Sequence, residues 1–210
     1  MRLILASASP ARLAVLRAAG VDPEVVVSGV DEDAIAASMS GQHPTDVVVA
    51  LAAAKAAEVA ARVDYLDAVI VGCDSMLLVD GGLIGKPGTA KMARRRWRQL
   101  AGGTGDLLTG HAVLRLAGGT RAGSAEGVEC TTVRFATPTD DEIDAYLATG
   151  EPLGVAGGFT IDGLGGWFVD GVDGDPSNVI GISLPMTRRL LAKVGVRVTD
   201  VWRAPHWSRG

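Results

Sequence analysis

A continuous apolar run, Ala68-Val69-Ile70-Val71-Gly72-Cys73, is the feature that most constrains the fold. A strand buried on both faces has such an unbroken run, whereas a strand with one face in water alternates. The sequence therefore predicts a central strand over residues 68–73.

Asp74 and Ser75 directly follow this run. In open α/β sheets, ligands collect at the carboxyl ends of the strands. Asp74 is thus a candidate for metal binding or base chemistry. An aspartate that only caps the end of the strand explains the same position equally well.

The N-terminal segment predicts a strand that runs straight into a helix. Residues 3–6 are apolar, Ser9 fits an N-cap, Pro10 fits the first helical position and Gly20 fits the end. A helix N-terminus with a nearby Arg12 suits phosphate. Taken alone, the stretch is more simply an ordinary capped helix.

Further elements follow from local patterns. Residues 31–33 are expected to form an acidic surface turn, and residues 38–44 another turn. The remaining predicted elements are a strand near 25–27, an alanine-rich helix over 45–62, a hairpin over 76–84, a helix over 89–100, long strands over 107–116 and 121–136, a capped helix over 139–149 and a last helix over 185–194.

Composition limits the classes of protein. The 210 residues suit one domain, or a single core with lobes, and 48% hydrophobic with only 4% aromatic content leaves packing mostly to alanine, valine and leucine. A net charge of -4 disfavours general nucleic-acid binding. Two cysteines and the lack of an 18-residue apolar run predict a cytoplasmic protein without a disulfide framework or membrane span.

Two lysines stand out. Lys55 lies four residues from both Leu51 and Val59, so it shares a helix face with apolar residues, which favours a functional role. Lys86 lies in Gly85-Lys86-Pro87, which is not a P-loop but still offers a point charge to phosphate.

The glycine-rich residues 154–175 lack the GxGxxG fingerprint of a dinucleotide site. Asp170, Asp173 and Asp175 likewise lack the spacing of a calcium loop. This segment is better interpreted as tight turns, or as backbone that approaches a ligand.

Several short motifs occur in an order that resembles the Maf family of nucleoside triphosphate pyrophosphatases, over about residues 2–195. They are Ser7-x-Ser9-Pro10-x-Arg12, Asp31-Glu32, the helix with Lys55, Gly72-x-Asp74-Ser75, Gly85-Lys86-Pro87, Thr109-Gly110 and Ala156-Gly157-Gly158-Phe159.

The resemblance implies a single domain over residues 1–210 with a peripheral tail, residues 199–210. The implied fold is mixed α/β and similar to that of the inosine triphosphate pyrophosphatases: an elongated mixed sheet flanked by helices, in two lobes with a cleft between them. It also implies a homodimer, a divalent metal ion and a cytoplasmic location.

The resemblance also implies roles for individual residues. Asp74 matches the catalytic aspartate of the family, described as the proton acceptor. Glu32 and Asp74 are the candidates for holding Mg²⁺ or Mn²⁺. The implied substrate-binding residues are Ser7, Ser9, Arg12, Lys55 and Lys86.

Three positions linked to substrate choice fall at Ala11, Ser75 and Asp162. The subgroup for dTTP and UTP has arginine, threonine and glutamine there, and the subgroup for 7-methyl-GTP has a bulky residue, glutamine and glutamate. Ala11 fits neither, Ser75 is closer to the first and Asp162 to the second. Val155 also replaces a lysine that is common in the family.

The implied reaction is hydrolysis of a nucleoside triphosphate, canonical or modified, to the monophosphate and pyrophosphate, which would remove unwanted nucleotides from the pool. A non-catalytic, nucleotide-binding regulator of cell division is the alternative. The joint presence of carboxylates and lysines favours the enzyme. The sequence leaves open whether Asp74 acts as a base or as a metal ligand.

Overall fold

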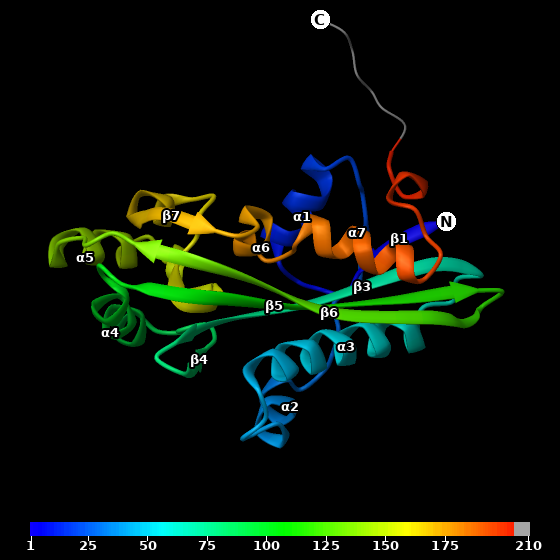
Figure 1. Cartoon of the computed structure of the whole chain (residues 1–210), viewed down its shortest axis with the longest axis horizontal. Coiled ribbons are helices and arrows are strands. Elements are labelled where there is room, and N and C mark those ends of the chain that lie inside the picture. The colour runs from blue at the N-terminus through cyan, green and yellow to red at the C-terminus, as the bar shows by residue number, and fades with distance from the viewer. Residues whose placement is uncertain (204–210) are drawn as a thin grey trace, which may run out of the picture. The chain divides into compact units, whose positions relative to one another are not determined.

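The computed structural model describes residues 1–203 (Figure 1), so most of the predicted tail lies outside the described residues. The helices and strands, with 3-10 helices labelled η, are β1 Arg2–Leu5, α1 Pro10–Ala18, β2 Glu24–Val25, α2 Glu32–Ser38, α3 Pro44–Arg62, β3 Asp67–Val79, β4 Gly82–Ile84, α4 Ala90–Leu100, β5 Thr104–Ala117, β6 Thr120–Phe135, α5 Asp140–Ala148, η1 Glu151–Gly154, η2 Ala156–Gly158, η3 Leu164–Phe168, β7 Val169–Asp173, α6 Pro176–Ile180, α7 Leu184–Lys193 and η4 Val198–Asp200.

The strands form a mixed sheet. Its order is β2-β1-β3-β5-β6-β7, and β4 pairs with β3 outside this path. Strand β1 is parallel to both of its neighbours, β2 and β3. Strand β4 is antiparallel to β3, and β7 is antiparallel to β6. The predicted mixed α/β class is therefore confirmed.

The chain divides into two compact units. Unit 1 contains residues 1–74, 110–128 and those from Leu184 onward, and unit 2 contains residues 75–109 and 129–183. Strands β3, β5 and β6 each continue from one unit into the other. The single domain and the cleft that the resemblance implies stay predictions.

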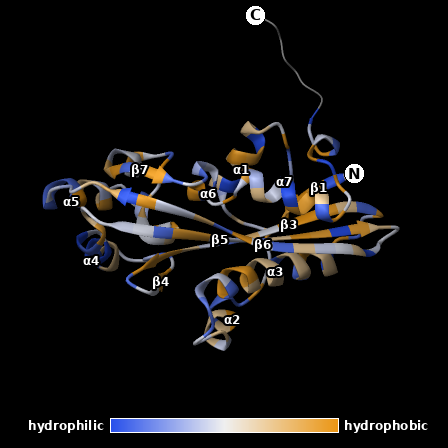
Figure 2. Cartoon of the chain, viewed as in Figure 1, coloured by the Kyte–Doolittle hydropathy of each residue, from blue (hydrophilic) through white to orange (hydrophobic). Residues whose placement is uncertain are grey.

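Unit 1 is built on the parallel strands β1 and β3. Helix α3 covers one face of the sheet here, and α1 and α7 cover the other (Figure 1). A core cluster of unit 1 is aliphatic and includes Ile4, Ala52, Val59, Ile70 and Leu114. Its alanines suit the alanine-rich α3, which Figure 2 shows as mostly hydrophobic, unlike the basic α4.

Unit 2 has an aromatic core, which the composition did not predict. Trp97 is fully buried and meets Phe135, Tyr146 and Phe168 edge-on, with ring centroids 5.7–5.9 Å apart. Edge-to-face pairs of this kind add about 0.5–1.5 kcal/mol each beyond the burial of area. The few aromatic residues are thus concentrated in one of the two cores.

Most predicted elements are confirmed. Helix α1 begins after Ser9, whose hydroxyl accepts from Arg12 N, and α5 begins with the predicted Thr139–Glu142 capping box. The hairpin turns at Asp80 and Gly81, which both have positive φ. The predicted strand near 25–27 is only the two-residue β2.

Two predictions of elements are wrong, those for residues 31–33 and for residues 154–175. Residues 31–33 are not a turn, because Asp31 accepts from Ala34 N and caps helix α2. The glycine-rich residues 154–175 contain β7, and α6 follows them, although neither was predicted. No helix within residues 1–203 is long and apolar enough to cross a membrane.

Asp74 does not follow the end of a strand. Strand β3 continues without a break from Asp67 to Val79. Its first part pairs with β1 up to Val71, and its last part pairs with β4 from Leu77. The polar Asp74-Ser75 pair therefore lies in mid-strand. The prediction that the strand ends at residue 73 and that Asp74 follows its carboxyl end was wrong.

Candidate active site

The turn between β1 and α1 builds the first part of the site, in unit 1. Ser7 and Arg12 are 7% and 9% exposed. Arg12 Nη1 donates to Ser7 Oγ at 2.9 Å, and Ser9 N donates to the same oxygen at 3.2 Å. The buried guanidinium is thus held beside the N-terminus of α1, the positive end of the helix dipole, an arrangement that suits phosphate.

Lys55 forms the second part of the site with two carboxylates. Its ammonium lies 2.6 Å from Asp74 Oδ1 and 2.8 Å from Glu32 Oε1. The side chains of Lys55 and Asp74 are only 6% and 9% exposed, whereas that of Glu32 is 47% exposed. Glu32 is therefore the member of this group that faces solvent.

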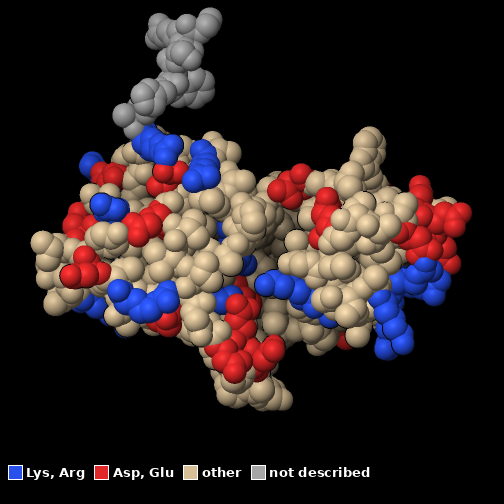
Figure 3. Space-filling model, turned by 180° about the vertical axis from the view of Figure 1, so that it is seen from behind, with Lys and Arg blue, Asp and Glu red and all other residues tan. Residues whose placement is uncertain are grey.

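Helix α2 brings Glu32 to this group. Its cap, Asp31, fixes the start of the helix, so Glu32 falls in the first turn. Acidic side chains gather where α2 projects from unit 1 (Figure 3), and Asp31, Glu32 and Asp33 are all exposed.

Two glycines allow α3 to bring Lys55 close to β3. A Cβ atom at Gly72 would lie 2.3 Å from Ala52 O, and one at Gly110 would lie 2.1 Å from Val48 O. The helix backbone therefore rests directly on β3 and β5. This close approach explains why a lysine on an apolar helix face reaches Asp74.

The two parts of the site surround the same residue. The parallel register pairs Leu5 with Val71, so the chain after β1 runs beside Cys73. Burial raises the pKa of the Cys73 thiol to about 11, and Arg12, Asp74 and Lys55 also act on it through their charges. Arg12, Lys55 and Asp74 thus share one electrostatic environment.

The donor set of this site fits a small, hard cation. Glu32 and Asp74 bring one oxygen each to the same point of positive charge, the Lys55 ammonium. Within residues 1–203 no group of three or more His, Cys, Asp or Glu could hold a metal ion alone. Mg²⁺ is commonly held by one or two carboxylates together with substrate phosphates, so two carboxylates suffice.

The other predicted site residues belong to different surroundings. Ala11 lies on α1 and is partly buried. Ser75, Lys86 and Asp162 lie in unit 2. Ser75 Oγ is 2.9 Å from Thr109 Oγ1, whereas Lys86 and Asp162 are exposed.

Sequence reasoning missed how the Lys86 loop is held. Arg96 Nη1 donates to Gly85 O at 2.6 Å, and Gly157 N donates to the same oxygen at 3.3 Å. Burial lowers the pKa of the Arg96 guanidinium. The run of basic residues in α4 gave no signal that would separate Arg96 from its neighbours.

The other arginines of α4 pair with α5. Arg94 pairs with Asp144, and Arg98 pairs with Asp140. Acidic and basic side chains accordingly lie together on this part of the surface (Figure 3).

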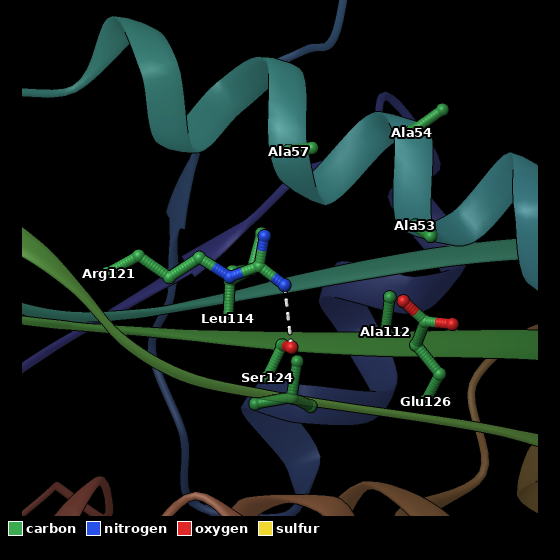
Figure 4. A pocket seen from close by; sticks show the side chains of 9 residues that line it. Ala53, Ala54, Ala57, Ala112, Leu114, Arg121, Ser124 and Glu126 are labelled. Carbon is green, nitrogen blue, oxygen red and sulfur yellow. Dashed lines mark hydrogen bonds between the residues drawn. The ribbon is translucent and has the colours of Figure 1, made fainter.

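Unit 1 also has a separate small hollow of about 250 Å³ (Figure 4). Alanines of α3 and residues 112–114 of β5 line it, and Arg121 donates to Ser124 at its rim. None of the predicted site residues lines it. It therefore adds nothing to the chemistry of the Lys55 group.

The family model for Maf-like proteins matches residues 2–194. The chain belongs to the Maf family. The predicted resemblance is thereby confirmed. The match includes every predicted site residue, from Ser7 to Asp162.

Curated Maf-family relatives match over nearly their whole lengths. A protein from Saccharopolyspora erythraea is 61% identical over 208 residues, which cover 98% of this chain and 99% of the relative. One from Nocardia farcinica is 62% identical and covers 97% of both chains. One from Rhodococcus jostii is 61% identical, with 95% of both chains covered. All three are named nucleoside triphosphate pyrophosphatase.

Proposed function

We propose that this Maf protein hydrolyses nucleoside triphosphates to the monophosphate and pyrophosphate, with Mg²⁺ or Mn²⁺ as cofactor. The observation that carries the proposal is the buried Lys55 ammonium held between Glu32 and Asp74, next to the Arg12–Ser7 pair. The names of the relatives support the same reaction.

The positively charged side chains of the site would bind the triphosphate. A triphosphate carries about four negative charges near neutral pH, and phosphoryl transfer is catalysed mostly by positioning and charge stabilisation. Arg12 offers a fork of N–H donors and Lys55 a point charge. The positive end of the α1 helix dipole adds to them. Lys86 would add a further charge from its own loop.

The reaction forms a bond between a water oxygen and the α-phosphorus. The bond from the α-phosphorus to the bridging oxygen breaks, and pyrophosphate leaves with that electron pair. Asp74 orients the water and receives its proton, while Lys55 keeps the carboxylate in place. Glu32 and Asp74 would hold a divalent cation, which would neutralise phosphate charge and make bound water more acidic.

Base choice would fall to Ala11, Ser75 and Asp162, with Asp162 as an acceptor for base N–H groups. We further propose that the protein acts as a cytoplasmic homodimer that removes unwanted nucleotides from the pool.

The decisive experiment is pyrophosphate release from a panel of common and modified nucleoside triphosphates, with Mg²⁺, Mn²⁺ or EDTA. Asp74→Asn is expected to lose at least about 100-fold of the turnover, the range for removal of a proton acceptor. Removing one partner of a buried pair costs up to about 3–5 kcal/mol, but Glu32 still pairs with Lys55 here. A thermal melt therefore has to show that the variant is folded.

Asp46→Asn is the matched control, because Asp46 lies in the first turn of α3, away from the Lys55 group. Near wild-type turnover in a folded Asp74→Asn variant would contradict the role of Asp74. Absence of pyrophosphate release with every nucleotide and both metals would favour a nucleotide-binding regulator instead.

A further inference from the structure

A single carboxylate in unit 2, that of Glu151, holds the loop that carries Asp162. Its Oε1 accepts from Gly165 N at 3.0 Å and also from the Thr160 hydroxyl. Its Oε2 accepts from Leu164 N at 3.1 Å. The donors lie on both sides of Asp162 in the sequence. Glu151 therefore closes a turn that contains Asp162.

Two glycines of this turn are required by the carboxylate and by one of its hydrogen-bond partners. A Cβ atom at Gly163 would lie 2.8 Å from Glu151 Oε2, and one at Gly165 would lie 2.5 Å from the Tyr146 hydroxyl oxygen. Tyr146 itself donates to Glu151 Oε1 at 3.0 Å. The backbone thus wraps closely around the carboxylate and its partners, which leaves the turn little conformational freedom.

Glu151 binds the turn as a charged acceptor. Burial raises its pKa, but hydrogen bonds from Thr160, Gly165, Leu164 and Tyr146 outweigh this effect and lower the pKa. The ionised carboxylate accepts all four hydrogen bonds, which a neutral amide of the same shape cannot do.

Asp162 takes no part in holding the turn. It is exposed, and its carboxylate has no hydrogen bond or ion pair with the residues that the structure describes. The turn therefore presents a carboxylate whose acceptor sites all remain available to a ligand. The rigid turn around a neighbouring glutamate fixes the backbone from which that carboxylate projects.

We infer that Glu151 is a positioning residue for base selection: it fixes Asp162 so that this carboxylate accepts N–H groups of the nucleobase. The inference rests on the proposed function. Guanine, with neighbouring N1–H and amino N–H donors, matches a carboxylate best. Adenine presents an unprotonated ring nitrogen at the same edge and is repelled. The preferred substrates are thus nucleotides with a guanine-type edge.

The test compares kcat/KM for GTP and ATP in wild type, Glu151→Gln, Asp162→Asn and the double variant. Glutamine keeps the shape but turns an amide NH₂ toward backbone N–H donors. We expect Glu151→Gln to reduce the preference for GTP by about 10-fold, as a misplaced polar contact does. In the Asp162→Asn background, the same change should leave the preference unaltered, because coupled residues are not additive.

Asp170→Asn is the matched control, since Asp170 is an exposed carboxylate of unit 2 outside the turn. It should leave the preference unchanged. A purely structural role for Glu151 would lower the rate equally for both nucleotides in both backgrounds, and this result would overturn the inference. So would a wild-type enzyme that releases pyrophosphate without preferring GTP.

Thr160→Val removes one hydrogen-bond donor to Glu151, and it replaces Glu151→Gln in the test if that variant does not fold. It should change the preference in the same direction by a smaller factor, and an unchanged preference would contradict the inference. Failure of the proposed function looks different: wild type itself would release no pyrophosphate from either nucleotide.

Discussion

Lys55 is a buried ammonium that contacts two carboxylates, and the buried one, Asp74, would be costly to keep charged without it. Like charges held near one another disfavour ionisation, and isolated buried charges are unfavourable. The lysine thus stabilises the free protein in the same place where a substrate and cation would bind. Stability and activity of this site are linked through a single side chain.

Lys55→Met should therefore destabilise the protein by about 3–5 kcal/mol, because Asp74 is left buried without its cation. It should also abolish most activity. In addition, Mn²⁺ should raise the melting temperature of this variant more than that of wild type, because the two carboxylates lose the competing ammonium. The measurement is a thermal melt with and without Mn²⁺.

Lys91→Met is the control, since Lys91 is an exposed lysine of α4. An equal effect of Mn²⁺ on all three proteins would show that Glu32 and Asp74 do not hold a cation in the free protein.

At the scale of elements, the close approach of α3 to the sheet depends on two glycines. Gly72 and Gly110 meet the backbone of the helix at Ala52 and Val48. A methyl group at either position would push the helix away from the sheet. The geometry of Lys55 and Asp74 follows from this contact.

Gly72→Ala should cost at least about 2–3 kcal/mol, the upper range for overpacking, because its Cβ would lie 2.3 Å from Ala52 O. Activity should fall further than stability, since Lys55 moves with α3. Urea unfolding and turnover measure the two effects. Gly29→Ala, whose Cβ would meet only Glu58 at 3.9 Å, should change neither. Equal stability of the two variants would contradict the close packing.

Trp97 links α4 to the last residue of η2. Its Nε1 donates to Gly158 O at 2.9 Å, and the ring is fully buried. Trp97→Phe should cost about 2–4 kcal/mol, from a cavity and an unsatisfied carbonyl. Denaturant unfolding tests this, with the exposed Trp167→Phe as control. A change below 1 kcal/mol in Trp97→Phe would mean that the loop relaxes and satisfies the carbonyl differently.

Local patterns in the sequence predicted the elements with strong caps and periodicity, such as α1 and α5. They failed where partners are distant in the chain. Strand β3 continues past Asp74 because β4 returns to pair with it, and no local pattern marks that change of partner. Helix α2 is short, with no buried residue, so it lacks the periodicity that reveals a helix.

The candidate site shows the same limit. The apolar spacing around Lys55 correctly marked an unusual lysine, and Ser9 was recognisable as a cap. The pairing of Lys55 with Glu32 spans different helices and follows only from the fold. Glu151 gave no signal, because its hydrogen bonds go to backbone groups more than ten residues away.

At the scale of the whole molecule, several carboxylates are stabilised in their charged form. Hydrogen bonds from Arg115, Arg98 and Arg197 lower the pKa values of Asp67, Asp140 and Asp200. Hydrogen bonds also lower the pKa of Glu151, against the effect of burial. A carboxyl group with a lowered pKa in the folded state binds protons more readily once it is unfolded.

Stability should therefore be constant from neutral pH down to about pH 5 and fall below about pH 4, as pH passes from the unfolded to the folded pKa values. Melting temperatures across this range are the measurement. Asp140→Asn should slightly reduce the fall in melting temperature at acid pH. Added salt should do the same, because the Arg98–Asp140 ion pair is exposed and therefore screened. A melting temperature that rises on acidification would contradict the predicted loss of stability at acid pH.

The order of segments along the chain determines which of the two units is complete first during translation. Unit 1 includes the first residues and also α7, whose Leu190 and Leu191 are each 1% exposed. Unit 2 ends at Ser183. A ribosome thus finishes unit 2 first, although it begins with unit 1. During translation, the face of the unit 1 sheet opposite the alanine-rich helix therefore lacks the cover of α7 until this last helix has been made.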